Sequence, residues 1–172
     1  IRIRHVESRE DQPETLEHTK FAGIAWHPKN NGFFYNRYPD AATVGEAETS
    51  FYNAVYWHTL GSDQSEDILI YERPDHKDYD FFPQVSHDGK YLILTVYLGT
   101  DRRNRIYYAP LAEHAPYNRP EDTDFQSEFV ELLDDADAHY RFLGNHESEF
   151  YFFTDKDAPR GSVVSINVET GE

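Results

Sequence analysis

Short apolar runs separated by polar turns recur along the chain. Tyr91–Tyr97 (YLILTVY) and Phe150–Phe153 (FYFF) are almost continuously apolar. A strand with one face in water would alternate apolar and polar residues, so both segments must be covered on two faces. Stacked β-sheets provide such cover, and the aromatic content of 16% also suits β-structure better than a helical bundle.

Three segments of similar pattern line up along the chain. They read AWHPKNNGFFYNRY, VSHDGKYLILTVY and FLGNHESEFYFFTD, and their aromatic anchors Phe33, Tyr91 and Phe150 lie 58 and 59 residues apart. A further strand-like segment follows each (NAVYWHTL, NRIYYAPL, GSVVSINV), and two units add a fourth (DILIYE, FVELL). Four short strands per period are typical of a β-propeller blade. The sequence therefore predicts an all-β fold with about three four-stranded antiparallel blades.

The turns between these strands carry their own signals. Asn31-Gly32 and Asp88-Gly89 precede the first two anchors and favour positive φ in two-residue hairpins, whereas Glu147-Ser148 lacks the glycine and predicts a different turn. The polar stretch GSDQSED, residues 61–67, reads as the connection between the third and fourth strands of a blade. Its acids and hydroxyls can bond to their own backbone.

This phasing divides the chain into four parts. Residues 1–20 finish one blade, residues 21–75 form a second, residues 79–137 form a third, and residues 138–172 supply part of a fourth. The first residues, IRIRHV, are already strand-like and lack a Met, which indicates an internal segment of a longer protein.

Charge and composition limit the possible partners. The net charge of −16 disfavours nucleic acid and anionic membranes, because phosphate binding needs Lys and Arg. The acid-rich stretch of residues 121–137 is predicted to be a solvated loop and edge strand. No membrane span or signal peptide is evident, and location stays open between cytoplasm and periplasm. The chain has no cysteine, so disulfides and thiol chemistry are excluded.

The sequence offers no catalytic or metal-binding pattern. It contains no Gly-x-Ser-x-Gly nucleophile motif, and its nine histidines form no His-x-His or His-x-x-x-His pair. We therefore expect no catalytic residue, no metal and no cofactor within this chain. His27, His58 and His139 are predicted to be hydrogen-bonding residues of edges or loops.

Several stretches together resemble the propeller of prolyl oligopeptidase, the proline-specific serine peptidase. They are KFAGIAW, GFFYNRYP, LGSDQSEDI and SHDGKYLILTVYLGTDRRNRIYY, in order along the chain and most similar between Lys20 and Tyr108. Residues 46–50, EAETS, are similar to the family's Gly-Thr-Glu-Thr-Ser with two changes. The resemblance implies a seven-bladed propeller that caps an α/β-hydrolase domain. That domain would carry the catalytic Ser, Asp and His and is absent from this sequence.

The resemblance also implies which residues meet the substrate, a short proline-containing peptide. Phe21 would contribute to an apolar subsite beyond the proline pocket, although it could also be core at the start of an inner strand. A second subsite position falls on Asp80 or Phe81, depending on a one-residue shift, and a third falls on Thr100. The family often carries an apolar residue at the second position, whereas Thr100 is polar, so these two positions depart from the family's subsite pattern.

The loop from Ala41 to Asn53 matches a mobile segment of the family at the cleft between propeller and hydrolase. Its Gly45, Glu46, Glu48, Thr49 and Ser50 would then belong to a gate that admits substrate. An ordinary long connection within a blade is the alternative. On the gating interpretation, the propeller excludes large substrates and bulk water without taking part in the chemistry.

Two other functions remain open. One is a stand-alone propeller-type binding module, which the missing signatures of WD40 and kelch blades disfavour. The other is a different oligopeptidase of the same family, such as a dibasic-specific enzyme or a peptide macrocyclase. Three blades cannot close a ring, so the isolated segment is expected to expose apolar blade faces and to self-associate.

Overall fold

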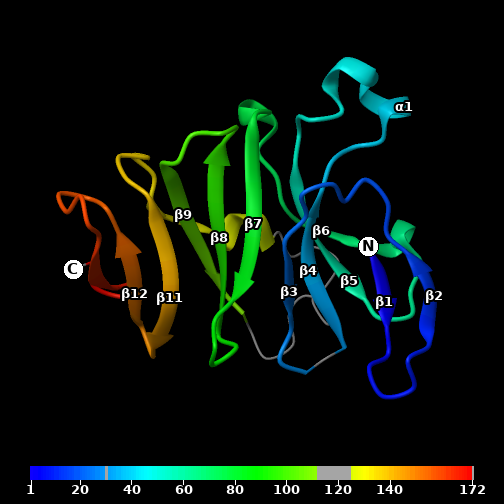
Figure 1. The fold of residues 1–172 in the computed structure, drawn as a ribbon, viewed down its shortest axis with the longest axis horizontal. Coiled ribbons are helices and arrows are strands. Elements are labelled where there is room, and N and C mark those ends of the chain that lie inside the picture. Colours follow the sequence, from blue (N-terminus) through cyan, green and yellow to red (C-terminus); the bar gives the residue numbers. More distant parts are fainter. Residues whose placement is uncertain (30, 112–124, 172) are drawn as a thin grey trace.

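Four antiparallel sheets stand side by side in chain order in the computed structural model (Figure 1). The structure describes residues 1–29, 31–111 and 125–171. The predicted all-β class is confirmed. Within the described residues, no helix is long and apolar enough to cross a membrane.

The sheets and helical turns have the following bounds. The first sheet pairs β1 (Arg2–Arg4) with β2 (Asp11–Thr15). The second has the order β3 (Ile24–Trp26), β4 (Gly32–Arg37), β5 (Ala54–Thr59) and β6 (Ile68–Tyr71). The third has β7 (Tyr79–Val85), β8 (Tyr91–Leu98), β9 (Asn104–Pro110) and β10 (Val130–Leu133), and the fourth has β11 (Tyr140–His146), β12 (Glu149–Thr154) and β13 (Ser162–Asn167). The helical turns are α1 (Ala41–Val44), η1 (Glu46–Glu48), η2 (Gln64–Glu66), η3 (Pro74–His76) and η4 (Phe125–Glu128).

The core lies between neighbouring sheets, and β8 shows why its sequence is continuously apolar. Its Leu92, Leu94 and Val96 pack into the cluster shared with the second sheet. Ile93 points the other way, into the cluster shared with the fourth sheet. All four side chains are fully buried. The prediction that this strand is covered on both faces is confirmed, and stacked sheets provide the cover.

The hairpin turns differ from their predicted forms. Gly32 does not have positive φ but lies within β4. It must be glycine because a Cβ there would come 2.3 Å from the His58 carbonyl oxygen and 2.4 Å from the Trp57 ring. Gly89 does have positive φ (73°), but its turn is longer than two residues, since Ser86 N bonds to Tyr91 O. The third hairpin is the two-residue turn, and Glu147 takes the positive φ of 54°.

The connection GSDQSED joins β5 to β6 as predicted, and its Asp63 accepts a hydrogen bond from Ser65 N at 2.9 Å. One member goes further. The Asp67 side chain is fully buried and bonds to His58 and to the Tyr35 hydroxyl. The prediction that His58 is an edge or loop residue is therefore wrong, because it lies in β5 inside the second sheet.

The acid-rich stretch is only partly described, since its residues 121–124 lie outside the described residues. Its β10 is the edge strand of the third sheet, as predicted. The acids there are also bonded. Glu131 pairs with Arg73 at 2.7 Å, and Asp134 accepts a hydrogen bond from the Tyr107 hydroxyl at 2.5 Å. These contacts connect the edge strand and the residues after it to neighbouring parts of the fold.

Candidate substrate-facing site

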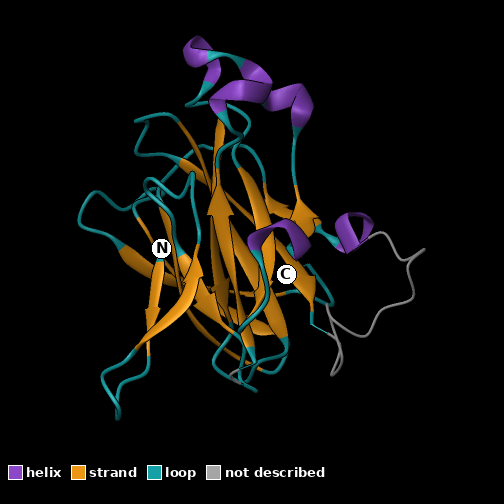
Figure 2. Ribbon diagram, turned by 90° about the vertical axis from the view of Figure 1, so that its right-hand side faces the viewer, coloured by secondary structure: helices purple, strands orange, loops and turns teal. Residues whose placement is uncertain are grey.

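Strand directions bring the predicted site residues to one end of the sheets. Antiparallel pairing places the start of β3, the end of β4 and the start of β5 together, and it places the start of β7 beside the end of β8. The two sheets share this end, because the Asn53 side chain accepts a hydrogen bond from Phe81 N at 3.0 Å. Helical turns project past the strand ends here, α1 among them (Figures 1 and 2). We call this region the loop end.

Phe21 lies at the loop end, just before β3, and its side chain is 79% exposed. The alternative that Phe21 is core is therefore wrong for this structure. Its backbone is left-handed, with φ of 58°, and Tyr52 at the same end has φ of 59°. Bulky residues rarely adopt this conformation, which costs roughly 1–2 kcal/mol. Two strained, solvent-accessible aromatic residues at one end are consistent with a binding role.

The structure separates the two residues of the ambiguous subsite position. Phe81 is only 1% exposed, and its ring packs 5.2 Å from that of Tyr71 in the core between sheets. Asp80 instead accepts a hydrogen bond from the Tyr38 hydroxyl at 2.5 Å. Burial raises the pKa of Asp80 above its ordinary value, and burial likewise raises the pKa of Tyr38. Both residues lie at the loop end, and Asp80 is the partly exposed member of the pair.

Thr100 is exposed in the turn that follows β8. The pairing of Tyr79 with Leu98 brings this turn to the same end as Asp80. The turn is braced by Asp101, whose carboxylate accepts from Arg103 Nη2 at 2.6 Å. Hydrogen bonds from Arg103 lower the pKa of Asp101 to about 2. Thr100 is therefore presented to solvent by a locally fixed turn.

The loop of residues 41–53 forms two short helical turns with no buried residue. Asp40 begins the first by accepting a hydrogen bond from Ala42 N at 2.9 Å. Gly45 joins the two turns with φ 84° and ψ 157°, a conformation essentially restricted to glycine. Gly45, Glu46, Glu48, Thr49 and Ser50, the residues predicted for the gate, thus lie on one projecting segment (Figure 1).

A hollow of about 310 Å³ lies between this loop and the segment that precedes Phe21. Sequence reasoning missed two of its lining residues, Lys20 and Tyr38. The Lys20 ammonium lies 5.1 Å from the centre of the Tyr38 ring. The sequence did contain one signal, because lysine is scarce in this chain and Lys20 directly precedes Phe21. The hollow is lined by His18, Thr19, Lys20, Tyr38, Pro39, Ala41 and Thr49.

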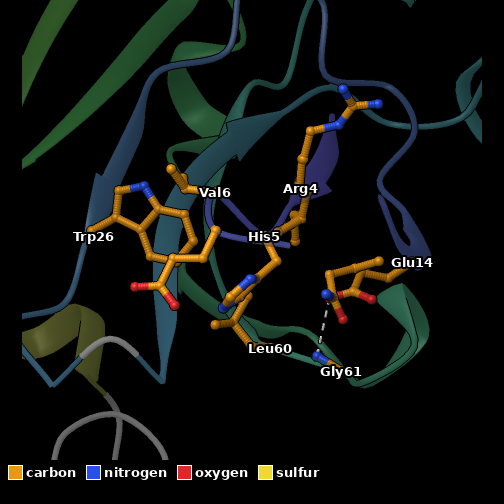
Figure 3. A pocket seen from close by; sticks show the side chains of 10 residues that line it. Arg4, His5, Val6, Glu14, Trp26, Leu60 and Gly61 are labelled. Carbon is orange, nitrogen blue, oxygen red and sulfur yellow. Dashed lines mark hydrogen bonds between the residues drawn. The ribbon is translucent and has the colours of Figure 1, made fainter. Parts of the chain in front are cut away.

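A larger hollow, of about 800 Å³, lies elsewhere, between the β1–β2 hairpin and the second sheet (Figure 3). Ile3, Val6, Trp26 and Leu60 give it apolar walls. At its rim, Gly61 N donates a hydrogen bond to Glu14 Oε1 at 3.2 Å (Figure 3). Arg4, His5, Glu7, Gln12 and Glu14 also line it, whereas none of the predicted site residues does.

One serine and one histidine are in contact within the described residues. Ser8 Oγ lies 3.2 Å from His5 Nδ1, but the same nitrogen accepts the Ser8 backbone N–H at 3.2 Å. This contact closes an exposed turn between residues three apart. Within the described ranges, no three His, Asp or Glu residues are grouped to hold a metal ion.

Comparison with known proteins gives one consistent answer. The family model described as "Prolyl oligopeptidase, N-terminal beta-propeller domain" matches residues 1–172. Prolyl oligopeptidase A of Galerina marginata is 33% identical over 98% of this chain and 23% of its own length. Prolyl endopeptidase of Dictyostelium discoideum is 30% identical over 92% of this chain and 21% of its own length.

The solved structures agree. Prolyl oligopeptidase B from Galerina marginata, in a mutant form bound to a 25mer macrocyclization substrate, superposes with a TM-score of 0.79 and 26% identity. The match covers 94% of this chain and 21% of that one. This chain thus spans about a fifth of the length of the relatives it matches.

Proposed function

Because the chain belongs to the family of N-terminal β-propeller domains of prolyl oligopeptidases, we propose that it is the non-catalytic propeller part of a proline-specific serine endopeptidase. In that role, it caps the active site, admits only short peptides and lines part of the substrate pocket. The partner within the parent chain is an α/β-hydrolase domain that carries the nucleophile. The segment alone has no peptidase activity in this proposal.

One observation carries the proposal. Phe21, Asp80 and the loop of residues 41–53 converge on the loop end although they are far apart in the sequence. This end also holds the exposed, strained Phe21 ring. An exposed aromatic residue in an unfavourable backbone conformation contributes little to folding, so its presence is explained by a ligand or a partner domain. A stand-alone binding module would need no such match to an oligopeptidase propeller.

The observations constrain the substrate specificity of the parent protein less than they constrain its class. Relatives of this chain include a dual function macrocyclase-peptidase POPB of Galerina marginata, 30% identical over 89% of this chain and 20% of its own length. A cyclising or a purely hydrolytic parent would use the same propeller surface. We favour proline-specific hydrolysis, with Asp80 and Thr100 giving the outer subsites a more polar character than an apolar residue would.

Phe21→Ala in the intact parent protein tests the proposal. The variant should raise KM for peptides with an apolar residue two positions before the proline, by a factor corresponding to roughly 1–3 kcal/mol of lost contact. Phe21→Leu is the matched control, since it keeps an apolar side chain and should retain most of the affinity. Thermal stability should stay unchanged in both, because the ring is exposed.

The opposite pattern would count against this function. If KM is unchanged while stability falls by several kcal/mol, Phe21 is buried against another part of the parent protein and does not contact substrate.

A further inference from the structure

Two of the chain's five lysines hold the loop of residues 41–53 in place. Lys20 belongs to the segment before β3, and its Nζ donates a hydrogen bond of 2.7 Å to Ser50 Oγ. Lys77 reaches the same loop from the far side, from the connection between η3 and β7. The two helical turns of the loop contain no buried residue, so these polar contacts replace an apolar anchor there.

Lys77 makes the more extensive set of contacts. Its ammonium lies 2.8 Å from Glu48 Oε1 and sits 4.8 Å from the centre of the Phe51 ring. Its backbone carbonyl accepts a hydrogen bond from Tyr52 N at 2.7 Å. Each partner strengthens the ionic form of the other, since the hydrogen bond from Lys77 lowers the pKa of Glu48 and Glu48 raises the pKa of Lys77.

The two halves of the loop are held differently. Residues 48–52 are attached to Lys77 and Lys20, whereas α1 lies beyond Gly45 and, among the described elements, packs extensively only on η1. Gly45 is the joint between them, and a Cβ there would meet nothing within 4 Å. Within the described part of the chain, release of the Lys77 contact would therefore leave residues 45–50 held only by the Lys20–Ser50 hydrogen bond and the Tyr52 backbone bond.

We propose that the Lys77–Glu48 pair is a salt-sensitive latch that holds the loop of residues 41–53 against the loop end. Both side chains are partly exposed, and such ion pairs are weak and screened by salt. A weak latch opens readily, which is what passage of a peptide requires. The significance for gating rests on the proposed function, but the latch itself can be tested without it.

Hydrogen exchange of the intact parent protein gives that test. Lys77→Met removes the charge and keeps an apolar stem over Phe51. Amides of residues 46–50 should exchange about two- to fivefold faster in this variant at low salt, the range expected for an exposed ion pair. Lys90→Met is the matched control, because it removes the same charge from the hairpin at the other end of β7 and should leave these amides unchanged.

Two further measurements separate ionic attraction from packing. In the unmodified protein, 1 M NaCl should raise exchange of residues 46–50 toward the rate of the Lys77→Met variant, because charges are screened within about 3 Å at that ionic strength. The exchanged pair Lys77→Glu with Glu48→Lys should restore protection. Equal exchange in the unmodified protein and Lys77→Met, or no response to salt, would overturn the latch.

Kinetics then test the link to gating. If the loop admits substrate, Lys77→Met should increase kcat/KM for long peptides more than for short ones. Faster exchange with unchanged kinetics would keep the latch and reject the gating part of the proposed function.

Discussion

His58 Nδ1 and Asp67 Oδ1 lie 2.7 Å apart, and neither side chain is exposed. The Tyr35 hydroxyl donates to the other oxygen of the same carboxylate, and Arg37 lies 4.0 Å away. Asp67 is thus the only acid among these four, and from the connection that precedes β6 it links two strands of the second sheet, β4 and β5. Burial, followed by the hydrogen bond to Asp67, raises the pKa of the Tyr35 hydroxyl, so this group remains a donor.

Removal of the Asp67 carboxylate should therefore strongly destabilise the propeller. We expect Asp67→Ala to lower the free energy of unfolding by about 3–5 kcal/mol, because it leaves a buried histidine and tyrosine without their partner. Glu66→Ala, an exposed neighbour in the same connection, should change it by less than about 0.5 kcal/mol. Urea unfolding of the intact parent protein measures both, and equal effects would refute the role given to Asp67.

The sequence allowed the sheets to be predicted but not this network. Continuous apolar runs indicated strands covered on both faces, and the stacked sheets confirm that reading at Leu92 and Ile93. Periodicity could not fix which face each anchor occupies. Phe33 and Phe150 point toward the preceding sheet, whereas Tyr91 packs toward the following one, 4.9 Å from Phe150. From the sequence, Asp67 resembled the other acids of its loop, because its hydrogen-bond partner His58 is nine residues away, in β5.

Gly32 provides a second stability test. Gly32→Ala should cost about 1–3 kcal/mol or more, since the added methyl group would overlap the His58 carbonyl and the Trp57 ring. Gly23→Ala is the matched control, because a Cβ there would make contacts of 3.4 Å and longer and its backbone is not left-handed. Similar melting temperatures for the two variants would show that the strands separate easily at Gly32.

The site was less predictable than the fold, for a physical reason. The residues Phe21, Asp80 and Thr100 were found through a resemblance, and nothing in their local pattern shows that they share one end. That requires the strand directions, which follow from sheet pairing. No sequence pattern pointed to Lys77 or Tyr38. Their roles depend on contacts with Glu48 and Asp80, which are far from them in the sequence.

Asp80 should make stability depend on pH. Burial raises its pKa in the folded state, so its ionisation opposes folding at higher pH, and this cost is relieved as the pH falls through the raised pKa. As the pH falls from 7 to 4, the free energy of unfolding of the unmodified protein should therefore rise relative to that of Asp80→Asn. Unfolding curves at several pH values decide the matter, and a difference of opposite sign would contradict the burial of Asp80.

The segment of 172 residues should not hydrolyse a fluorogenic Gly-Pro peptide when purified alone. Its Ser8–His5 contact is an exposed turn, and the proposed function places the nucleophile on another domain. Ser8→Ala serves as the control for trace activity of this pair. Turnover that follows the protein through repeated purification and disappears in Ser8→Ala would reverse the conclusion.

The isolated segment should also self-associate, because its outermost sheets present apolar surface with no neighbour. On the fourth sheet, Phe150 and Phe152 face the core, so Tyr151 and Val163 lie on the opposite face, and Val163 is 63% exposed. At the other side of the segment, the two-stranded first sheet covers the second sheet only in part, and Trp26 of β3 stays 47% exposed. A ring of blades needs about four to eight members, and these three and a fraction cannot cover their own ends. Apolar faces of this kind normally form interfaces.

Light scattering at micromolar concentration should therefore give a mass above 20.2 kDa. Combining Tyr151→Lys with Val163→Lys should shift the segment toward the monomer, because charges on the contact face oppose apolar packing. Thr100→Lys, on the exposed turn at the loop end, should leave association intact and is the control for an added lysine away from the contact face. The segment could instead be a cooperatively folded monomer whose mass none of the three substitutions changes. The fourth sheet would then need no neighbour, and the loop end alone would give this domain its partner surface.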